Sequence, residues 1–210
     1  MGNPKSPKPD PSTPPAPPTL WDRSRQVAVA AILDTALKLF AERGYERTTI
    51  AQIAQEAGIS QRSLFRYFGT KEDLVCGDQE ALGELLKNTV DAQPADASPW
   101  DALRAGFEAV LVANHTPDRV LQISTLILNT PSLRARAIEK RLRWQAALVP
   151  GIETRMGIPH GPVPDPRALA VITTAFACLD TATELWVRTA GTTDITQTYD
   201  QALTTVRTTP

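Results

Sequence analysis

Apolar residues recur every three or four positions along most of this chain, with polar residues between them. That period is typical of amphipathic α-helices, which turn one face toward a core. No segment has the regular alternation of apolar and polar residues that a half-buried strand shows. The pattern therefore predicts an all-α fold of about nine helices.

Glycine, proline and capping residues predict where these helices begin and end. Gly44 follows one apolar-periodic segment as a C-terminal residue would, and Pro166 opens another behind Asp165. Loops are expected at 92–99 and 157–165, where prolines cluster. The expected helices cover residues 22–43, 50–57, 61–68, 71–91, 100–115, a segment around 120–127, 132–156, 166–190 and 194–205.

Two of these helices are short and are joined by a tight turn at residues 57–59. Thr49 and Gln52 match a Thr-x-x-Gln capping box at the start of the first, and Ser60 is a good N-cap for the second. Gly58 suits the corner because glycine readily adopts positive φ. The arrangement predicts a helix-turn-helix, which places its second helix in the major groove of DNA.

The net charge of −1 does not by itself indicate a nucleic-acid partner. Its distribution is more informative, because residues 21–71 carry 8 Lys and Arg against 5 Asp and Glu, whereas residues 72–210 carry 12 against 17. A basic N-terminal third on an acidic body is consistent with a DNA-binding head.

Residues 1–20 hold eight prolines and cannot bury much apolar surface, so a disordered or polyproline-II tail is expected. An inert extension is the favoured interpretation. The alternative is a flexible arm whose Lys5 and Lys8 touch DNA phosphates.

The tail lacks the apolar stretch of a signal peptide, and no run of eighteen apolar residues predicts a membrane span. A cytoplasmic location is expected.

The sequence offers no catalytic or metal-binding constellation. Cys76 and Cys178 have apolar neighbours and are expected to be buried thiols, with a redox sensor as the alternative. His115 ends a predicted helix, His160 is expected to face solvent in a loop, and neither has a second ligand at metal-binding spacing. We therefore expect no enzyme activity, no metal and no cofactor.

One segment resembles the N-terminal domain of TetR-family transcriptional regulators, over about residues 24–75. The matching pieces are Leu39-Phe40, Gly44-Tyr45, Thr48-Thr49, Ile53-Ala54, Ala57-Gly58-Ile59-Ser60, Leu64-Phe65, Tyr67-Phe68, Lys71 and Leu74. The resemblance implies a three-helix DNA-binding domain at 21–70 and a helical ligand-binding and dimerisation domain at 71–210. It also implies a homodimeric repressor that binds a palindromic operator and is released by a small molecule.

The resemblance implies that the second short helix reads DNA. The residues carried over to the DNA interface are Thr49, Gln52, Ser60, Gln61, Arg62, Ser63, Arg66, Tyr67 and Lys71. Arg62 or Arg66 suits guanine and Gln61 suits adenine, whereas Tyr67 and Lys71 match phosphate-holding positions. Thr49 and Gln52 stand where a helix N-terminus can hold a phosphate. A merely solvated cationic face is the less favoured alternative. Phe65 is expected to pack in the core, rather than to contact a thymine methyl group.

The body is expected to dimerise through helices at about 166–190 and 194–207. Helix 166–190 is apolar on more than one face, so it requires a second partner besides its own core. Candidate ligand-lining residues are Trp100, Phe107, Trp144 and Phe176, aromatic side chains on apolar faces. The basic residues Arg134, Lys140, Arg141 and Arg143 are expected to form a solvated face, with attraction of an acidic ligand such as an acyl-CoA as the alternative.

The expected mechanism is that ligand in the body tilts the helix at 71–91 and so changes the separation of two recognition helices. The competing interpretation is a helical DNA-binding adaptor that acts through protein partners without a small ligand. The operator sequence, the effector and the number of dimers per operator stay open.

Overall fold

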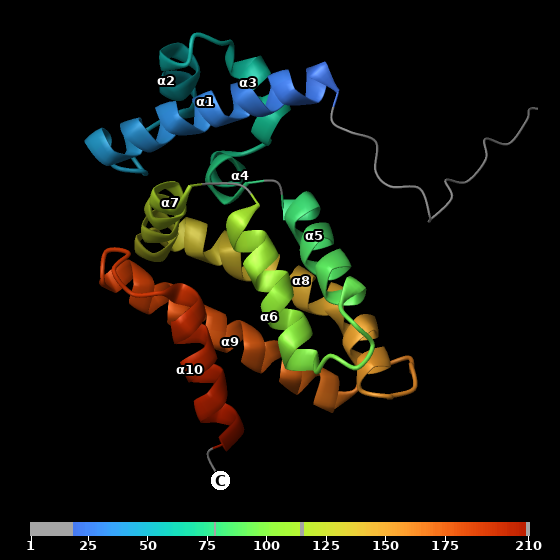
Figure 1. Cartoon of the computed structure of the whole chain (residues 1–210). Coiled ribbons are helices and arrows are strands. Elements are labelled where there is room, and N and C mark those ends of the chain that lie inside the picture. The colour runs from blue at the N-terminus through green and yellow to red at the C-terminus, as the bar shows by residue number, and fades with distance from the viewer. Residues whose placement is uncertain (1–18, 78, 114–115, 209–210) are drawn as a thin grey trace, which may run out of the picture.

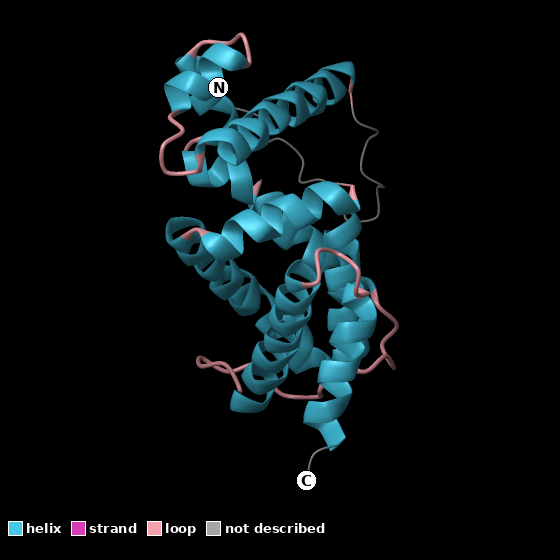
Figure 2. Cartoon of the chain, turned by 90° about the vertical axis from the view of Figure 1, so that its left-hand side faces the viewer, coloured by secondary structure: helices cyan, strands magenta, loops and turns pink. Residues whose placement is uncertain are grey.

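The computed structural model describes residues 19–77, 79–113 and 116–208, and this part of the chain forms ten α-helices and no strand (Figure 1; Figure 2). The helices are α1 (Leu20–Arg43), α2 (Ile50–Glu56), α3 (Gln61–Phe68), α4 (Lys71–Cys76), α5 (Gln79–Ala92), α6 (Pro99–Val112), α7 (Pro117–Asn129), α8 (Pro131–Arg155), α9 (Pro166–Arg188) and α10 (Ile195–Thr208). The all-helical prediction is confirmed. The expectations for most of the proline-rich tail and for His115 concern residues outside the described part of the chain.

Helices α1, α2 and α3 lie together at one end of the molecule, which we call the head (Figure 1). Below them α5, α6, α7, α8, α9 and α10 form the body, in which α7 packs on α8 and α9 and faces the head, and α4 lies between the two. The head core contains Leu33, Phe40, Ile53 and Leu64, all buried. It also includes Ile123 of α7, so the head packs directly on the body.

The predicted helix over 71–91 is wrong, because the chain breaks at Gly77. There φ is +75° and ψ is −175°, a conformation that side-chain-bearing residues rarely adopt. The two halves also belong to different cores, since Leu74 and Val75 of α4 are buried with the head whereas Leu86 of α5 is buried in the body. The head and the body are therefore not connected by one continuous helix.

Polar contacts fasten α4 to α8. Arg136 donates from Nε and Nη2 to Asp73 Oδ1, at 3.1 and 2.8 Å, and Lys140 Nζ donates to the Cys76 carbonyl at 3.4 Å. Arg141 pairs with Asp180 of α9. The predicted solvated face is therefore wrong for Lys140 and Arg141, because their charges hold α8 to its neighbours.

Both cysteines are buried, as predicted. Burial raises the pKa of the Cys76 thiol to about 11 and also raises the pKa of Cys178. A thiol with a raised pKa is a poor nucleophile at neutral pH, so the structure favours the packing role over the redox sensor.

The body core is aromatic at its centre. Phe107 of α6 meets Phe176 of α9 edge to face with ring centroids 4.9 Å apart, and Tyr199 of α10 meets Phe107 at 5.8 Å. Such geometries place the positive edge of one ring against the negative face of another. These two aromatic contacts hold α6, α9 and α10 together.

Arg155, in the last turn of α8, closes the loop between α5 and α6. It donates to four carbonyl oxygens, those of Val90, Gln93, Pro94 and Ala97. Carbonyls at the end of α5 have no partner within their own helix, so this guanidinium satisfies them. The sequence pattern does not show this role, because the partners lie about sixty residues away.

A buried carboxylate organises the loop between α8 and α9. Glu153 is 4% exposed and accepts a hydrogen bond from the Asp165 backbone N–H at 2.9 Å, while His160 Nδ1 lies 2.9 Å from its second oxygen. These bonds, the backbone one first, hold the pKa of the Glu153 carboxyl below its usual value of 4.5. His160 is exposed, as predicted, but it is also a partner of Glu153.

We expect Glu153→Gln to flatten the acid limb of the stability profile. A carboxyl with a lowered folded-state pKa contributes stability above its unfolded pKa, and this contribution is lost as pH falls through the folded value. The wild-type melting temperature should therefore exceed that of the variant at pH 7, and the difference should shrink as pH falls below the usual pKa of 4.5 and through the lowered pKa of Glu153. The control is Glu56→Gln, at an exposed position of α2. Parallel profiles for wild type and Glu153→Gln would contradict this role.

By length and composition alone, α9 could cross a membrane, with mean hydropathy 1.4 over its most apolar stretch. The expectation that the sequence offers no such stretch needs this correction. In the fold α9 buries seven residues, among them Ile172 and Phe176, and it packs against α8 and α10. A central helix of a globular body has the same composition, so we assign α9 to the core.

Candidate nucleic-acid interface

The second short helix, α3, is anchored by buried Leu64, with Tyr67 and Phe68 packed against the same core, and it presents another face to solvent. Leu64 is fully buried in the head core, whereas Gln61, Arg62 and Arg66 are exposed. The turn before α3 has Gly58 at φ +67°, and Ser60 Oγ accepts from the Ser63 backbone N–H at 3.1 Å. The predicted turn and N-cap are confirmed, and together they fix the direction in which α3 leaves the turn.

The two arginines of α3 are available for a partner. Among the described residues neither Arg62 nor Arg66 forms an ion pair, whereas seven other arginines do. The Arg66 guanidinium lies 5.7 Å from the Tyr67 ring centroid. Stacking of this kind orders an arginine without consuming its hydrogen-bond donors.

Phe65 does not pack in the core, and that prediction is wrong. Its side chain is 48% exposed, on the same side of α3 as Gln61, which lies one helical turn earlier. The buried position next to it belongs to Leu64. An exposed phenylalanine beside two free arginines adds an apolar group to this surface.

The N-terminus of α2 is already engaged in its own capping box. The Thr49 backbone N–H donates to Gln52 Oε1 at 2.8 Å, and Thr49 Oγ1 accepts from the Gln52 N–H at 3.2 Å. The predicted capping box is confirmed. A phosphate at this end would compete with the Gln52 side chain for the same donors.

Lys71 is held at the junction of α1, α2 and α4. Its ammonium donates to the carbonyl oxygens of Tyr45 at 3.0 Å and Thr48 at 3.2 Å, and it lies 4.0 Å from the Tyr45 ring centroid. The Tyr45 hydroxyl in turn donates to Glu72 at 3.0 Å, and burial raises the pKa of Tyr45. An ammonium has three donors, so one remains after the two carbonyls are satisfied.

We expect Lys71→Met to lower stability as well as DNA affinity. Two carbonyls and an aromatic ring lose a cationic partner, which should cost about 1–3 kcal/mol. Thermal unfolding measures this loss, and a salt titration of DNA binding measures whether the slope also falls by about one unit. Lys38→Met is the matched control, because Lys38 is exposed and its one ion-pair partner among the described residues, Glu42, is 4.0 Å away. An unchanged melting temperature would show that the carbonyl contacts contribute little.

Family models match both parts of the chain. Residues 32–76 match the model described as bacterial regulatory proteins of the tetR family, and residues 97–209 match the MftR C-terminal domain. The second match alone spans more than half of the chain. The chain belongs to the TetR family. TetR-family proteins are DNA-binding transcriptional regulators rather than enzymes, and this chain is such a regulator.

Among curated relatives, the mycofactocin biosynthesis transcriptional regulator MftR of Mycobacterium tuberculosis is 30% identical, over 79% of this chain and 83% of its own length. The regulator TcmR of Streptomyces glaucescens is 29% identical over 60% of this chain, and the match spans 59% of TcmR. Among solved structures, FadR of Bacillus halodurans aligns with a TM-score of 0.56 at 20% identity, over 85% of this chain and 94% of that one. FadR of Thermus thermophilus, solved with lauroyl-CoA, gives 0.52 at 20% identity over 85% and 93%.

The candidate effector-lining residues of this TetR-family chain all belong to the body core or pack against it. Phe107 and Phe176 are buried and touch each other, whereas Trp100 and Trp144 are partly buried. The void beside Phe107 measures about 10 Å³, which holds at most one water molecule. An effector at Phe107 would therefore have to displace core side chains.

Exposed apolar side chains occur on both α9 and α10. Leu169 and Leu185 of α9 are 39% and 42% exposed, and Val206 of α10 is 54% exposed. By helical spacing Leu169 and Leu185 flank the face of α9 that is buried in the body, one on each side. This TetR-family chain thus presents apolar residues on the two helices that the sequence assigns to dimerisation.

Proposed function

We propose that the protein is a homodimeric TetR-family repressor that binds a palindromic operator and is released by a small-molecule effector. The observation that carries the proposal is α3, where Arg62 and Arg66 are exposed and unpaired on a helix fixed by buried Leu64. Arginines that lie free on a rigid helix suit bidentate contacts to guanine. A cytoplasmic location follows from this role.

Each residue of the proposed interface has a distinct role. Arg62, Arg66 and Gln61 read base edges together with Ser63 of α3 and its N-cap Ser60, and Tyr67 contacts a phosphate. Thr49 and Gln52 at α2 and Lys71 at α4 contact phosphates with the groups that their internal bonds leave free. The division into a tail at 1–20, a DNA-binding domain at 21–70 and an effector and dimerisation domain at 71–210 is part of this proposal.

The dimer forms through α9 and α10. Exposed Leu169 and Leu185 of α9 and exposed Val206 of α10 supply apolar surface on these two helices. A twofold axis through this face would place two α3 helices on one side of the dimer, as a palindromic operator requires. Sedimentation of a Leu169→Glu and Leu185→Glu double variant checks the assignment, with a monomer as the expected result.

An acyl-CoA thioester is the first effector class to test. Two fold neighbours, FadR of Thermus thermophilus and FadR of Bacillus subtilis, were solved in complex with lauroyl-CoA and stearoyl-CoA. In this chain an acyl group would enter the apolar core around Phe107 and Phe176, and exposed Arg134 would attract the phosphates. The effector acts on α8, which holds α4 through Arg136, and so moves the head.

The proposal is tested by selecting fragments of bacterial genomic DNA on the purified protein, followed by footprint sequencing. Enrichment of a palindromic site, and its loss on adding oleoyl-CoA or palmitoyl-CoA, would support a ligand-released repressor. A site that is unaffected by effectors but depends on an added protein would favour the adaptor alternative. No enriched site with or without effector would contradict α3 as a base-reading helix.

A further inference from the structure

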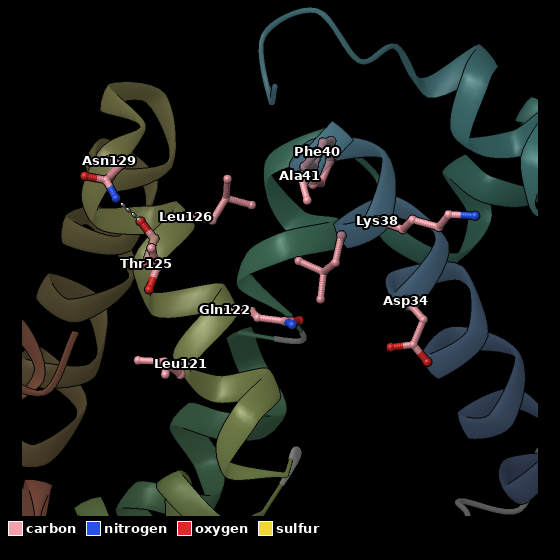
Figure 3. A pocket seen from close by; sticks show the side chains of 10 residues that line it. Asp34, Lys38, Phe40, Ala41, Leu121, Gln122, Thr125, Leu126 and Asn129 are labelled. Atoms are coloured by element: carbon pink, nitrogen blue, oxygen red, sulfur yellow. Dashed lines mark hydrogen bonds between the residues drawn. The ribbon is translucent and has the colours of Figure 1, made fainter. Parts of the chain in front are cut away.

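A cleft separates the head from the body on the side where α1 faces α7. Its volume is about 610 Å³, which falls within the range of about 300–1,000 Å³ typical of small-molecule sites. Figure 3 shows side chains of α1 and α7 lining its opposite walls. The cleft is distinct from the body core, where the effector of the proposed repressor is expected to bind.

The walls of the cleft are mainly apolar. They come from α1 and α7, and each of these helices has residues buried in the head core. Leu37, Phe40 and Ala41 contribute from α1, and Leu121 and Leu126 contribute from α7. In Figure 3 Leu126 points from α7 toward α1. Apolar surface left in contact with water in a concave site is free to stabilise an apolar ligand by burial.

The charges around the cleft are already neutralised. Asp34 points into it and pairs with Arg119 of α7, an ion pair that joins the two walls. Lys38 directs its ammonium away from α7, toward the side where Glu42 lies 4.0 Å from it. A charged ligand would leave its charge against leucine and phenylalanine or would have to break the Asp34–Arg119 pair, and both are costly.

One polar group in the cleft has no partner. Gln122 projects from α7 toward α1, and its amide makes no hydrogen bond to any described residue. Asn129, by contrast, donates to the Thr125 carbonyl of its own helix at 2.9 Å. An amide offers two donors and an acceptor, so Gln122 can bind a carbonyl or a hydroxyl group inside an otherwise apolar site.

We propose that the α1–α7 cleft binds an uncharged, largely aromatic or polycyclic small molecule that presents a carbonyl or hydroxyl group to Gln122. The volume of the cleft limits the size of the ligand, and the apolar walls favour an apolar ligand. Because the Asp34–Arg119 pair is already neutralised, the cleft disfavours a ligand with a net charge. Such a ligand contacts the head and the body at once. It therefore adds to the Asp34–Arg119 contact in fixing α1 against α7, independently of any effector in the body core.

Nile red is a suitable probe, because it is an uncharged polycyclic dye with a carbonyl acceptor. We expect saturable binding to the full-length protein, measured by fluorescence titration without DNA. Ala41→Trp, which fills the cleft from α1, should abolish one class of binding site. Gln122→Leu, which keeps the apolar shape but removes the amide, should weaken that class roughly three- to tenfold, the usual effect of losing one hydrogen bond.

Val27→Trp is the matched control, because it adds the same side chain to α1 at a position that is 71% exposed and outside the cleft. It should bind the dye as wild type does, and circular dichroism should show equal helicity for all variants. Equal dye binding by wild type and Ala41→Trp would overturn the proposal, and so would the absence of saturable binding to wild type. Because no DNA is used, either result leaves the proposed repressor function to its own test.

Discussion

Replacing both Arg62 and Arg66 with alanine should abolish specific DNA binding without unfolding the protein. Each bidentate arginine contact contributes about 1–3 kcal/mol of discrimination, so the pair should contribute about 2–6 kcal/mol. At 25 °C this corresponds to a roughly 30-fold to 10⁴-fold loss of affinity for the selected operator. Both side chains are exposed and form no ion pair among the described residues, so their truncation should leave the melting temperature unchanged.

The control for this double variant removes two positive charges elsewhere. Arg167 begins α9 and Arg207 lies in the last turn of α10, and Figure 1 shows these helix ends at the opposite end of the molecule from α2 and α3. Fluorescence anisotropy measures the affinity of each variant for operator DNA and for random DNA. The comparison distinguishes the loss of a direct base contact from a general effect of lowering the net positive charge. If Arg167→Ala with Arg207→Ala weakens operator binding equally, α3 is not the reader.

Leu64→Ala should destabilise the head by about 2–5 kcal/mol, the usual cost of truncating a fully buried leucine. Leu64 is 0% exposed and joins α3 to the core formed by Phe40 and Ile53. Since whole domains are stable by only about 5–15 kcal/mol, this loss should be visible as a lower urea midpoint and as loss of all DNA binding at elevated temperature.

Phe65→Ala is the natural comparison, because it removes a larger side chain from the next position of the same helix. Phe65 is 48% exposed, so its truncation should change stability by less than about 1 kcal/mol. Any effect on operator affinity would then report a direct contact, such as one with a thymine methyl group. Comparable destabilisation by the two substitutions would contradict the packing of α3 described above.

Features fixed by local sequence could be predicted well. The capping box at Thr49, the N-cap at Ser60 and the positive φ of Gly58 each depend on residues within three positions. Phe65 was predicted wrongly although its spacing held the signal, because positions 61 and 65 share a helix face and position 64 does not. The expectation of burial rested on the general tendency of aromatic side chains to pack in cores, whereas the helical period indicates exposure.

Features that depend on distant partners could not be predicted. Arg155 caps carbonyls about sixty residues away, and the two walls of the α1–α7 cleft are joined by Asp34 and Arg119, which are 85 residues apart. Periodicity reports which face of a helix is apolar, but not which helix it meets or how closely. Gly77 is an intermediate case, because a glycine inside an apolar-periodic segment is compatible with either a continuous helix or a break.

The break at Gly77 separates two tasks that a continuous helix would join. Arg136 and Lys140 tie α4 to α8, while Leu86 and Val90 commit α5 to the body core. Substitutions along α5 can therefore change the body core to fit a new effector without changing how the DNA-binding head packs on α8. Effector specificity and operator geometry can therefore change separately in this chain, except at helices such as α8 that contact both the head and the body.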